Sequence, residues 1–221
     1  MLGAARVTNA LAMARRFVAQ CHPNAEAALL AGSRSRGEGA AGSDHDVILL
    51  FRELPGRAAW RETSIFEGQI VEAFSHDLLT FEYFCREIDR PSGLPVLPTM
   101  IAEGISLLRE LKRARQIAAE TLRLGPPPLA ADVVLSRRYA ITDMATSLAG
   151  DCDGDVVVAV GAALYTALAD FALRAAGRWS ATGKAIPRAL AATDTNLAAR
   201  FTEAFAALCA TGNAAPLSNP S

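Results

Sequence analysis

The stretch that decides the fold runs from Ala31 to Leu50 and reads AGSRSRGEGAAGSDHDVILL. Asp44 and Asp46 stand directly before a run of apolar residues, as at the start of an inner strand. Side chains alternate along a strand, so both aspartates face one side, with Cα atoms about 6.5–7 Å apart. Two carboxylates held so close repel each other, and a divalent cation relieves that repulsion. Mg²⁺ binds proteins through one or two carboxylates while substrate phosphates and water complete its shell, so the pair predicts a magnesium site.

A short glycine-serine turn precedes the aspartates. Gly32-Ser33 ends an apolar segment, 26–31, that reads as a strand. Glycine lets a backbone approach a phosphate closely, and the following N–H groups and the serine hydroxyl can hold its oxygens. The neighbouring arginines offer cationic partners to the same anion, although solvated loop charges are the alternative for both. The predicted nucleotide-binding residues of this stretch are Gly32, Ser33, Arg34, Arg36 and Ser43.

A third acid follows in the next strand candidate. Glu72 lies alone within the otherwise apolar segment 69–74, which is a poor place for a charge unless a neighbouring strand provides a partner. If this strand pairs with the strand of Asp44 and Asp46, Glu72 can complete the metal site or accept the proton of an attacking hydroxyl. The alternative is a strand-end acid in water.

The remaining pattern predicts an α+β fold in two parts. The first part, 1–108, is expected to hold a mixed sheet of four or five strands flanked by helices, with a strand near 65–66 and an edge strand at 105–108. Strand signals vanish after 109, and long helical periods follow, so we expect 109–221 to be an all-α helical bundle. The predicted helices span 110–123, 128–150, 154–177 and 194–210.

Composition excludes several classes of function. The chain has 221 residues, 51% hydrophobic and 20% charged, with a net charge of -1. No global basic field therefore draws in nucleic acid. The four scattered cysteines and three histidines show no zinc-ligand spacing. The scattered cysteines favour reduced thiols in the cytoplasm. The longest uncharged run, 156–169, is shorter than the roughly 18–20 apolar residues that span a bilayer, so no membrane role is expected. The oligomeric state is left open.

Taken together, Gly32-Ser33, a ten-residue gap and Asp44-x-Asp46 resemble the GS-x(9–13)-D-x-D signature of the polymerase-beta-like nucleotidyltransferase superfamily. The string is similar to that of the minimal and aminoglycoside nucleotidyltransferases, and it covers residues 26–76. His45 departs from the pattern, where an aliphatic residue is usual. The resemblance implies a transferase that uses two Mg²⁺ ions to move a nucleoside monophosphate from ATP or another NTP to a hydroxyl, with pyrophosphate leaving. Asp44, Asp46 and Glu72 would then be the catalytic and metal-binding residues.

The second half offers a weaker resemblance, to antibiotic-modifying members, which implies that the bundle 109–221 covers the acceptor or the nucleotide. The segment 178–190 is similar to a basic segment that faces the nucleotide in antibiotic-modifying members, which makes Lys184 a candidate nucleotide-binding residue. Solvated helix charge is the alternative. The leading hypothesis is transfer to a small-molecule hydroxyl, with an antibiotic among the candidates. The alternative is an antitoxin-type nucleotidyltransferase that acts on or binds a protein partner, and a third hypothesis is nucleotide binding without turnover. An acidic pocket would favour a cationic aminoglycoside, whereas an exposed apolar face would favour a protein.

Overall fold

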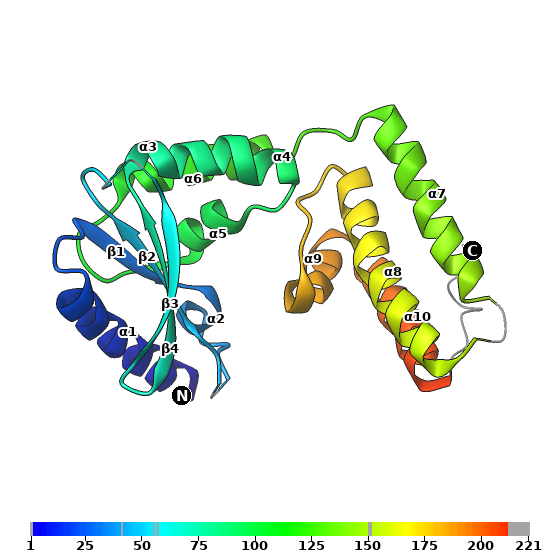
Figure 1. Cartoon of the computed structure of the whole chain (residues 1–221), viewed down its shortest axis with the longest axis horizontal. Coiled ribbons are helices and arrows are strands. Elements are labelled where there is room, and N and C mark those ends of the chain that lie inside the picture. Colours follow the sequence, from blue (N-terminus) through cyan, green and yellow to red (C-terminus); the bar gives the residue numbers. More distant parts are fainter. Residues whose placement is uncertain (1, 41, 55, 57, 150–151, 212–221) are drawn as a thin grey trace. The chain divides into compact units, whose positions relative to one another are not determined.

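A five-stranded mixed sheet organises the first half of the chain in the computed structural model (Figure 1). The structure describes residues 2–40, 42–54, 56, 58–149 and 152–211. β2 and β4 run parallel, while the other neighbouring strands pair antiparallel. The spatial order is β3-β4-β2-β1-β5. The strands are β1 (Ala27–Ala31), β2 (His45–Leu50), β3 (Trp60–Phe66), β4 (Gln69–His76) and β5 (Ile105–Ser106).

Helices cover both faces of this sheet. On one face, Phe17 of α1 (Leu2–Cys21) packs with Val47 and Leu49 of β2. On the other face, Ile48 and Leu50 pack with side chains of the later helices of this unit. β2 is therefore buried on both sides, which explains its continuous apolar run. The later helices are α3 (Leu78–Tyr83), the π-helical η2 (Phe84–Asp89), α4 (Arg90–Ser92), α5 (Val96–Glu103) and α6 (Lys112–Leu124).

Local sequence explains the two tightest connections. β1 passes directly into the short helix α2 (Gly32–Ser35). β3 and β4 are joined by Glu67 and Gly68, with φ angles of 49° and 73°. Positive φ at both central residues is what a two-residue hairpin turn requires. Asp77 begins α3 as its N-cap, because its carboxylate accepts a hydrogen bond from the backbone N–H of Thr80 at 2.8 Å.

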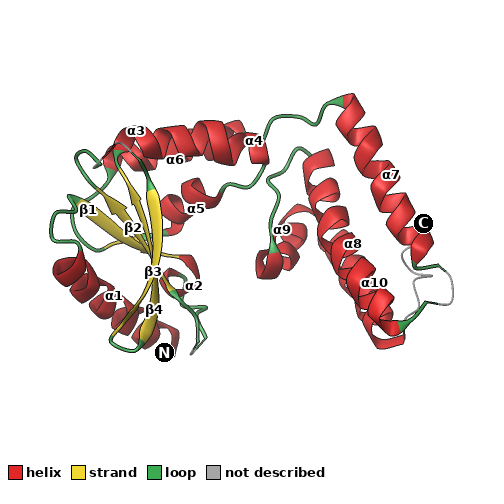
Figure 2. Ribbon diagram, viewed as in Figure 1, coloured by secondary structure: helices red, strands yellow, loops and turns green. Residues whose placement is uncertain are grey.

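The second unit contains only helices and loops in its described residues (Figure 2). Its aromatic core is built from Tyr165, Phe201 and Phe205, whose ring centroids lie 4.8–4.9 Å apart. Leu164, Leu173, Leu190 and Leu208 surround these rings in the same buried cluster. The elements are α7 (Ala131–Ser147), α8 (Gly154–Ala175), η3 (Gly183–Ala185), α9 (Ile186–Thr193) and α10 (Thr195–Thr211).

One helix in the described part of the chain, α8, is long and apolar enough to cross a membrane by length and composition. A mostly buried core helix of a soluble protein passes the same test, whereas 28% of the apolar window of α8 is buried, with Leu164, Ala169 and Leu173 in the buried cluster of the second unit. The absence of a membrane role therefore stays a prediction.

The α+β fold class predicted from the sequence is confirmed. The chain divides into the units Met1–Leu124 and Gly125–Ser221, whereas the sequence placed the division after residue 108. The difference is α6, whose Ile117 lies in the same buried cluster as Ile101 of α5. Residues 130–149 and 152–210 contain no strand, as expected. Residue 150 of the predicted helix 128–150 lies outside the described residues.

Candidate active site

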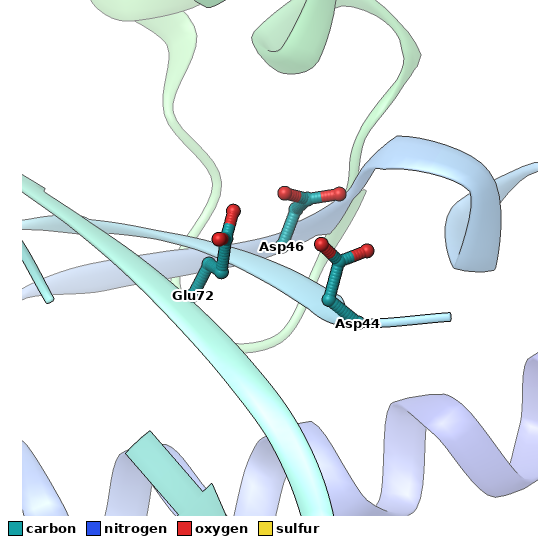
Figure 3. Close-up of side chains that lie close together, drawn as sticks. All are labelled: Asp44, Asp46 and Glu72. Carbon is teal, nitrogen blue, oxygen red and sulfur yellow. The ribbon is translucent and has the colours of Figure 1, made fainter. Parts of the chain in front are cut away.

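The register between β2 and β4 brings the three predicted acids together. Asp46 lies opposite Glu72 in neighbouring parallel strands, and Asp44 precedes β2 two residues before Asp46, hence on the same face. Ligand oxygens of the three half-buried carboxylates all lie within 4.8 Å of one another. Figure 3 shows the three side chains pointing to the same side of the two strands. The fold therefore brings the three acids that were predicted from the sequence together in one cluster.

At Gly32 the backbone of the turn after β1 lies directly against the Asp46 carboxylate. Ala31 is the last residue of β1 and pairs with Asp46, so the backbone turns at Gly32 next to the Asp46 carboxylate. Gly32 has a φ of 66°, in the left-handed region. A Cβ at this position would lie 2.9 Å from Cγ of Asp46 and closer still to its Oδ2. Only glycine leaves room here for the carboxylate in its present position.

Ser33 lies at the same turn with an unused hydroxyl. The residue is 7% exposed, and its Oγ has no hydrogen-bond partner within the described residues. A buried hydroxyl without a partner loses the hydrogen bonds that it would make in water. Its place beside Gly32, next to the acidic cluster, makes it a candidate donor to a phosphate oxygen.

The two predicted phosphate-binding arginines hold the loop that links α2 to β2. Arg34 donates to the carbonyl oxygen of Ser43 from Nη2 at 2.6 Å and from Nε at 3.2 Å. Ser43 in turn accepts, through its Oγ, a hydrogen bond from the backbone N–H of Ala40. Arg36 forms ion pairs at 2.8 Å with two carboxylates, those of Glu38 and Glu103. Both side chains thus fix the loop before Asp44, and their contact with a nucleotide stays a prediction.

Arg61 is the residue at the site that the sequence reasoning missed. Its Nη2 lies 2.5 Å from Oε2 of Glu72, and its guanidinium carbon lies 4.9 Å from the ring centroid of Phe74. The register of the β3–β4 hairpin could have identified Arg61 from the sequence. With Glu67 and Gly68 as the turn, Thr63 opposes Glu72, and Arg61 follows two residues away on the same face.

His45 points away from the acidic cluster, and Lys184 belongs to the second unit. His45 points to the opposite face of β2 from Asp46 and is buried, and this burial together with the charge of Arg34 lowers the pKa of its imidazole. Lys184 belongs to η3 of the second unit and is exposed. Its predicted role in nucleotide binding stays a prediction.

Comparisons with known proteins find similar chains among solved structures. No family model and no curated protein matches the chain. Among solved structures, a nucleotidyltransferase-like protein from Exiguobacterium sibiricum is similar, with a TM-score of 0.39 and 9% sequence identity. The match covers 87% of this chain and 66% of that chain. The proposal below therefore rests on the geometry of the site itself.

Proposed function

We propose that the chain is a divalent-metal-dependent nucleotidyltransferase that moves a nucleoside monophosphate from ATP or another NTP to a hydroxyl group. One observation carries the proposal. Asp44, Asp46 and Glu72 converge to within 4.8 Å beside a turn where Gly32 has no room for a side chain. Carboxylates for a metal, next to a tight turn for a phosphate, are what phosphoryl-group transfer needs, namely positioning and neutralisation of charge.

The donor set of the acidic cluster fits Mg²⁺. All three groups are carboxylates, and hard oxygen donors suit Mg²⁺ or Mn²⁺ rather than zinc or copper. Asp44, Asp46 and Glu72 would hold the ions, and two ions are proposed. When bound, they neutralise charge on the triphosphate and lower the pKa of the attacking hydroxyl.

The side chains of this unit then have separate tasks. The Gly32-Ser33 turn would hold the phosphates, with the unpartnered Ser33 hydroxyl as one donor. Glu72 would complete the metal site or receive the proton of the acceptor hydroxyl. Arg61 would hold the Glu72 carboxylate in place from β3. In the reaction, the acceptor oxygen bonds to the α-phosphorus, the bond from that phosphorus to the bridging oxygen breaks, and pyrophosphate leaves with the electron pair.

We propose a small molecule as the acceptor and the cytoplasm as the location. The four cysteines are described and all are free, in keeping with reduced thiols. A protein acceptor, as in the antitoxin-type alternative, would use the same chemistry at the α-phosphorus.

Isotopic labelling of the nucleotide tests which bond is cut. Purified protein is incubated with Mg²⁺, a panel of hydroxyl acceptors and ATP labelled in either the α- or the γ-phosphate. We expect the α-label on the acceptor and the γ-label in pyrophosphate. Transfer of the γ-label to the acceptor would make the protein a phosphotransferase, and release of free phosphate alone would make it a hydrolase. Asp46→Asn serves as the inactive control.

A further inference from the structure

A pocket with mostly aromatic and aliphatic walls lies beside Glu72 on the same face of the sheet. Its volume is about 370 Å³, within the range of sites that take small molecules, roughly 300–1,000 Å³. The side chains that matter for its chemistry are Arg61 of β3, Phe74 and His76 of β4, and Phe84 and Ile88 of η2. We call it the aromatic pocket.

Strand alternation connects the aromatic pocket to the acidic cluster. Glu72, Phe74 and His76 follow one another on one face of β4. Arg61 bridges the two sites, because its guanidinium is bonded to Glu72 and lies over the ring of Phe74. Adjacent same-face positions on a strand are about 6.5–7 Å apart. A ligand bound against Phe74 can therefore extend one substituent to Glu72.

The polar groups of the aromatic pocket define the chemistry of its ligand. His76 is 4% exposed, and its Nδ1 has no hydrogen-bond partner within the described residues. Burial lowers its pKa to about 4, so the imidazole is neutral near pH 7. Asp89, the acid of the lining, is turned to the backbone, since its Oδ2 accepts from the N–H of Leu97 at 2.7 Å. The walls thus offer aromatic faces and one arginine that is already paired with Glu72, which suits an uncharged aromatic group and not a polycation.

The order of the strands indicates which substrate enters the aromatic pocket. The Gly32-Ser33 turn follows β1, the acids stand on β2 and β4, and the pocket lies over β4 and β3, so the three follow one another across the sheet. In a displacement at phosphorus, the attacking and leaving oxygens lie roughly in line. If the leaving pyrophosphate rests at the Gly32-Ser33 turn, the attacking hydroxyl must come from the side of Glu72, where the pocket lies.

We propose that the aromatic pocket is the acceptor site and that the acceptor is an uncharged aromatic alcohol. This inference rests on the proposed function. The alcohol oxygen bonds to the α-phosphorus as pyrophosphate leaves, and the hydroxyl proton passes to Glu72. The nucleobase is the competing occupant of the aromatic pocket, and the experiment separates the two.

Binding of a neutral fluorinated alcohol tests the aromatic pocket directly. The probe is 4-(trifluoromethyl)benzyl alcohol, followed by ¹⁹F NMR without metal or nucleotide. Ile88 is 43% exposed on η2, so Ile88→Asp keeps the fold while placing a charge against the apolar walls, and it should weaken binding about tenfold or more. The matched control is Leu79→Asp, since Leu79 is 76% exposed on α3 and lies outside this lining. Equal affinity for wild type and Ile88→Asp would overturn the inference, as would displacement of the probe by adenosine.

Transfer to the same alcohol tests its role as acceptor. With Mg²⁺ and α-labelled ATP, we expect label on the alcohol and a raised KM for the alcohol in Ile88→Asp, with kcat changed much less. Binding without transfer by wild type would overturn the acceptor role. Calorimetry with Mg·ATP separates this inference from the proposed function. Suppose that Mg·ATP binds to wild type and not to Asp46→Asn, but that the alcohol binds Ile88→Asp as tightly as wild type. In that case only the inference about the aromatic pocket fails. If wild type does not bind Mg·ATP, the proposed function fails and the acceptor role fails with it.

Discussion

Replacement of Gly32 by alanine tests the contact that joins the phosphate turn to the metal site. Gly32 has a φ of 66° and lies against the Asp46 carboxylate. An added Cβ would be 2.9 Å from Cγ of Asp46, whereas carbon atoms in contact are about 3.5–4.0 Å apart. The contact with Oδ2 is closer still, so the carboxylate must retreat by more than about 1 Å, or the turn must open by as much.

Two separate effects follow from this change. A left-handed conformation costs a residue with a Cβ about 1–2 kcal/mol, so the protein should lose that much stability. A displacement of about 1 Å in a group that positions the reaction reduces the rate roughly 100-fold. We therefore expect Gly32→Ala to remain folded while the transfer of the α-label falls by about two orders of magnitude.

Gly68→Ala is the matched control, because it has the same strain without the collision. Gly68 has a φ of 73° in the β3–β4 turn, and an added Cβ there would meet nothing within 4 Å. Urea denaturation should give similar stability losses for the two variants, whereas only Gly32→Ala should lose activity and Mg²⁺ affinity. Near-wild-type transfer by Gly32→Ala, or an equal loss in Gly68→Ala, would refute the reasoning.

Three further predictions concern the acids of the first unit. Asp44→Asn and Asp46→Asn should each abolish transfer. In EDTA both variants should melt at an unchanged or slightly higher temperature, because one of the repelling charges is gone. Near-normal activity with Mg²⁺ in both would show that the motif is misassigned. Glu72→Gln should be severely impaired in transfer but still bind the nucleotide, which calorimetry can measure. Burial raises the pKa of Asp89 to about 6, so the folded protein holds the carboxyl proton more tightly than the unfolded chain. Protonation of Asp89 therefore contributes to the free energy of unfolding below about pH 4, and this contribution is lost as the pH rises through about 6. Relative to Asp89→Asn, the wild type should lose on the order of 2 kcal/mol of unfolding free energy between pH 4 and pH 7, measured in urea. A difference that does not change with pH would contradict this.

The fold class followed from patterns that depend on local chemistry. The apolar run after Asp46 and the helical periods beyond residue 125 each report burial of one segment, and that burial is visible in the sequence. The boundary between the units was harder, because α6 reads as an amphipathic helix wherever it packs. Only the packing of Ile117 in the core shared with Ile101 assigns it to the first unit.

The site was predictable where one strand determines it. Alternation alone places Asp44 and Asp46 on one face of β2. Glu72 needed the additional assumption that its strand pairs with β2, which the parallel register satisfies. Arg61 was not predicted, because its contact with Glu72 depends on a third strand, β3. Most of β3 gave no clear strand signal in the sequence. Partners that are distant along the chain are set by tertiary pairing, which residue patterns report only indirectly.

The contacts of the arginines bear on how charge is balanced at the site. A sequence shows that Arg34 and Arg36 are cations near a phosphate turn, but not which anions they face. In the structure Arg36 is already paired with Glu38 and Glu103, and Arg34 donates to the carbonyl of Ser43. Arg34 is therefore held by the loop, and Arg36 by the loop and by α5. The cluster of three carboxylates adds negative charge beside the place proposed for a triphosphate. Two divalent ions would supply four positive charges at that point, more than the three carboxylates remove. Under the proposed function, bound metal ions, rather than the arginines of the turn, would allow a polyanionic substrate to approach the acidic cluster.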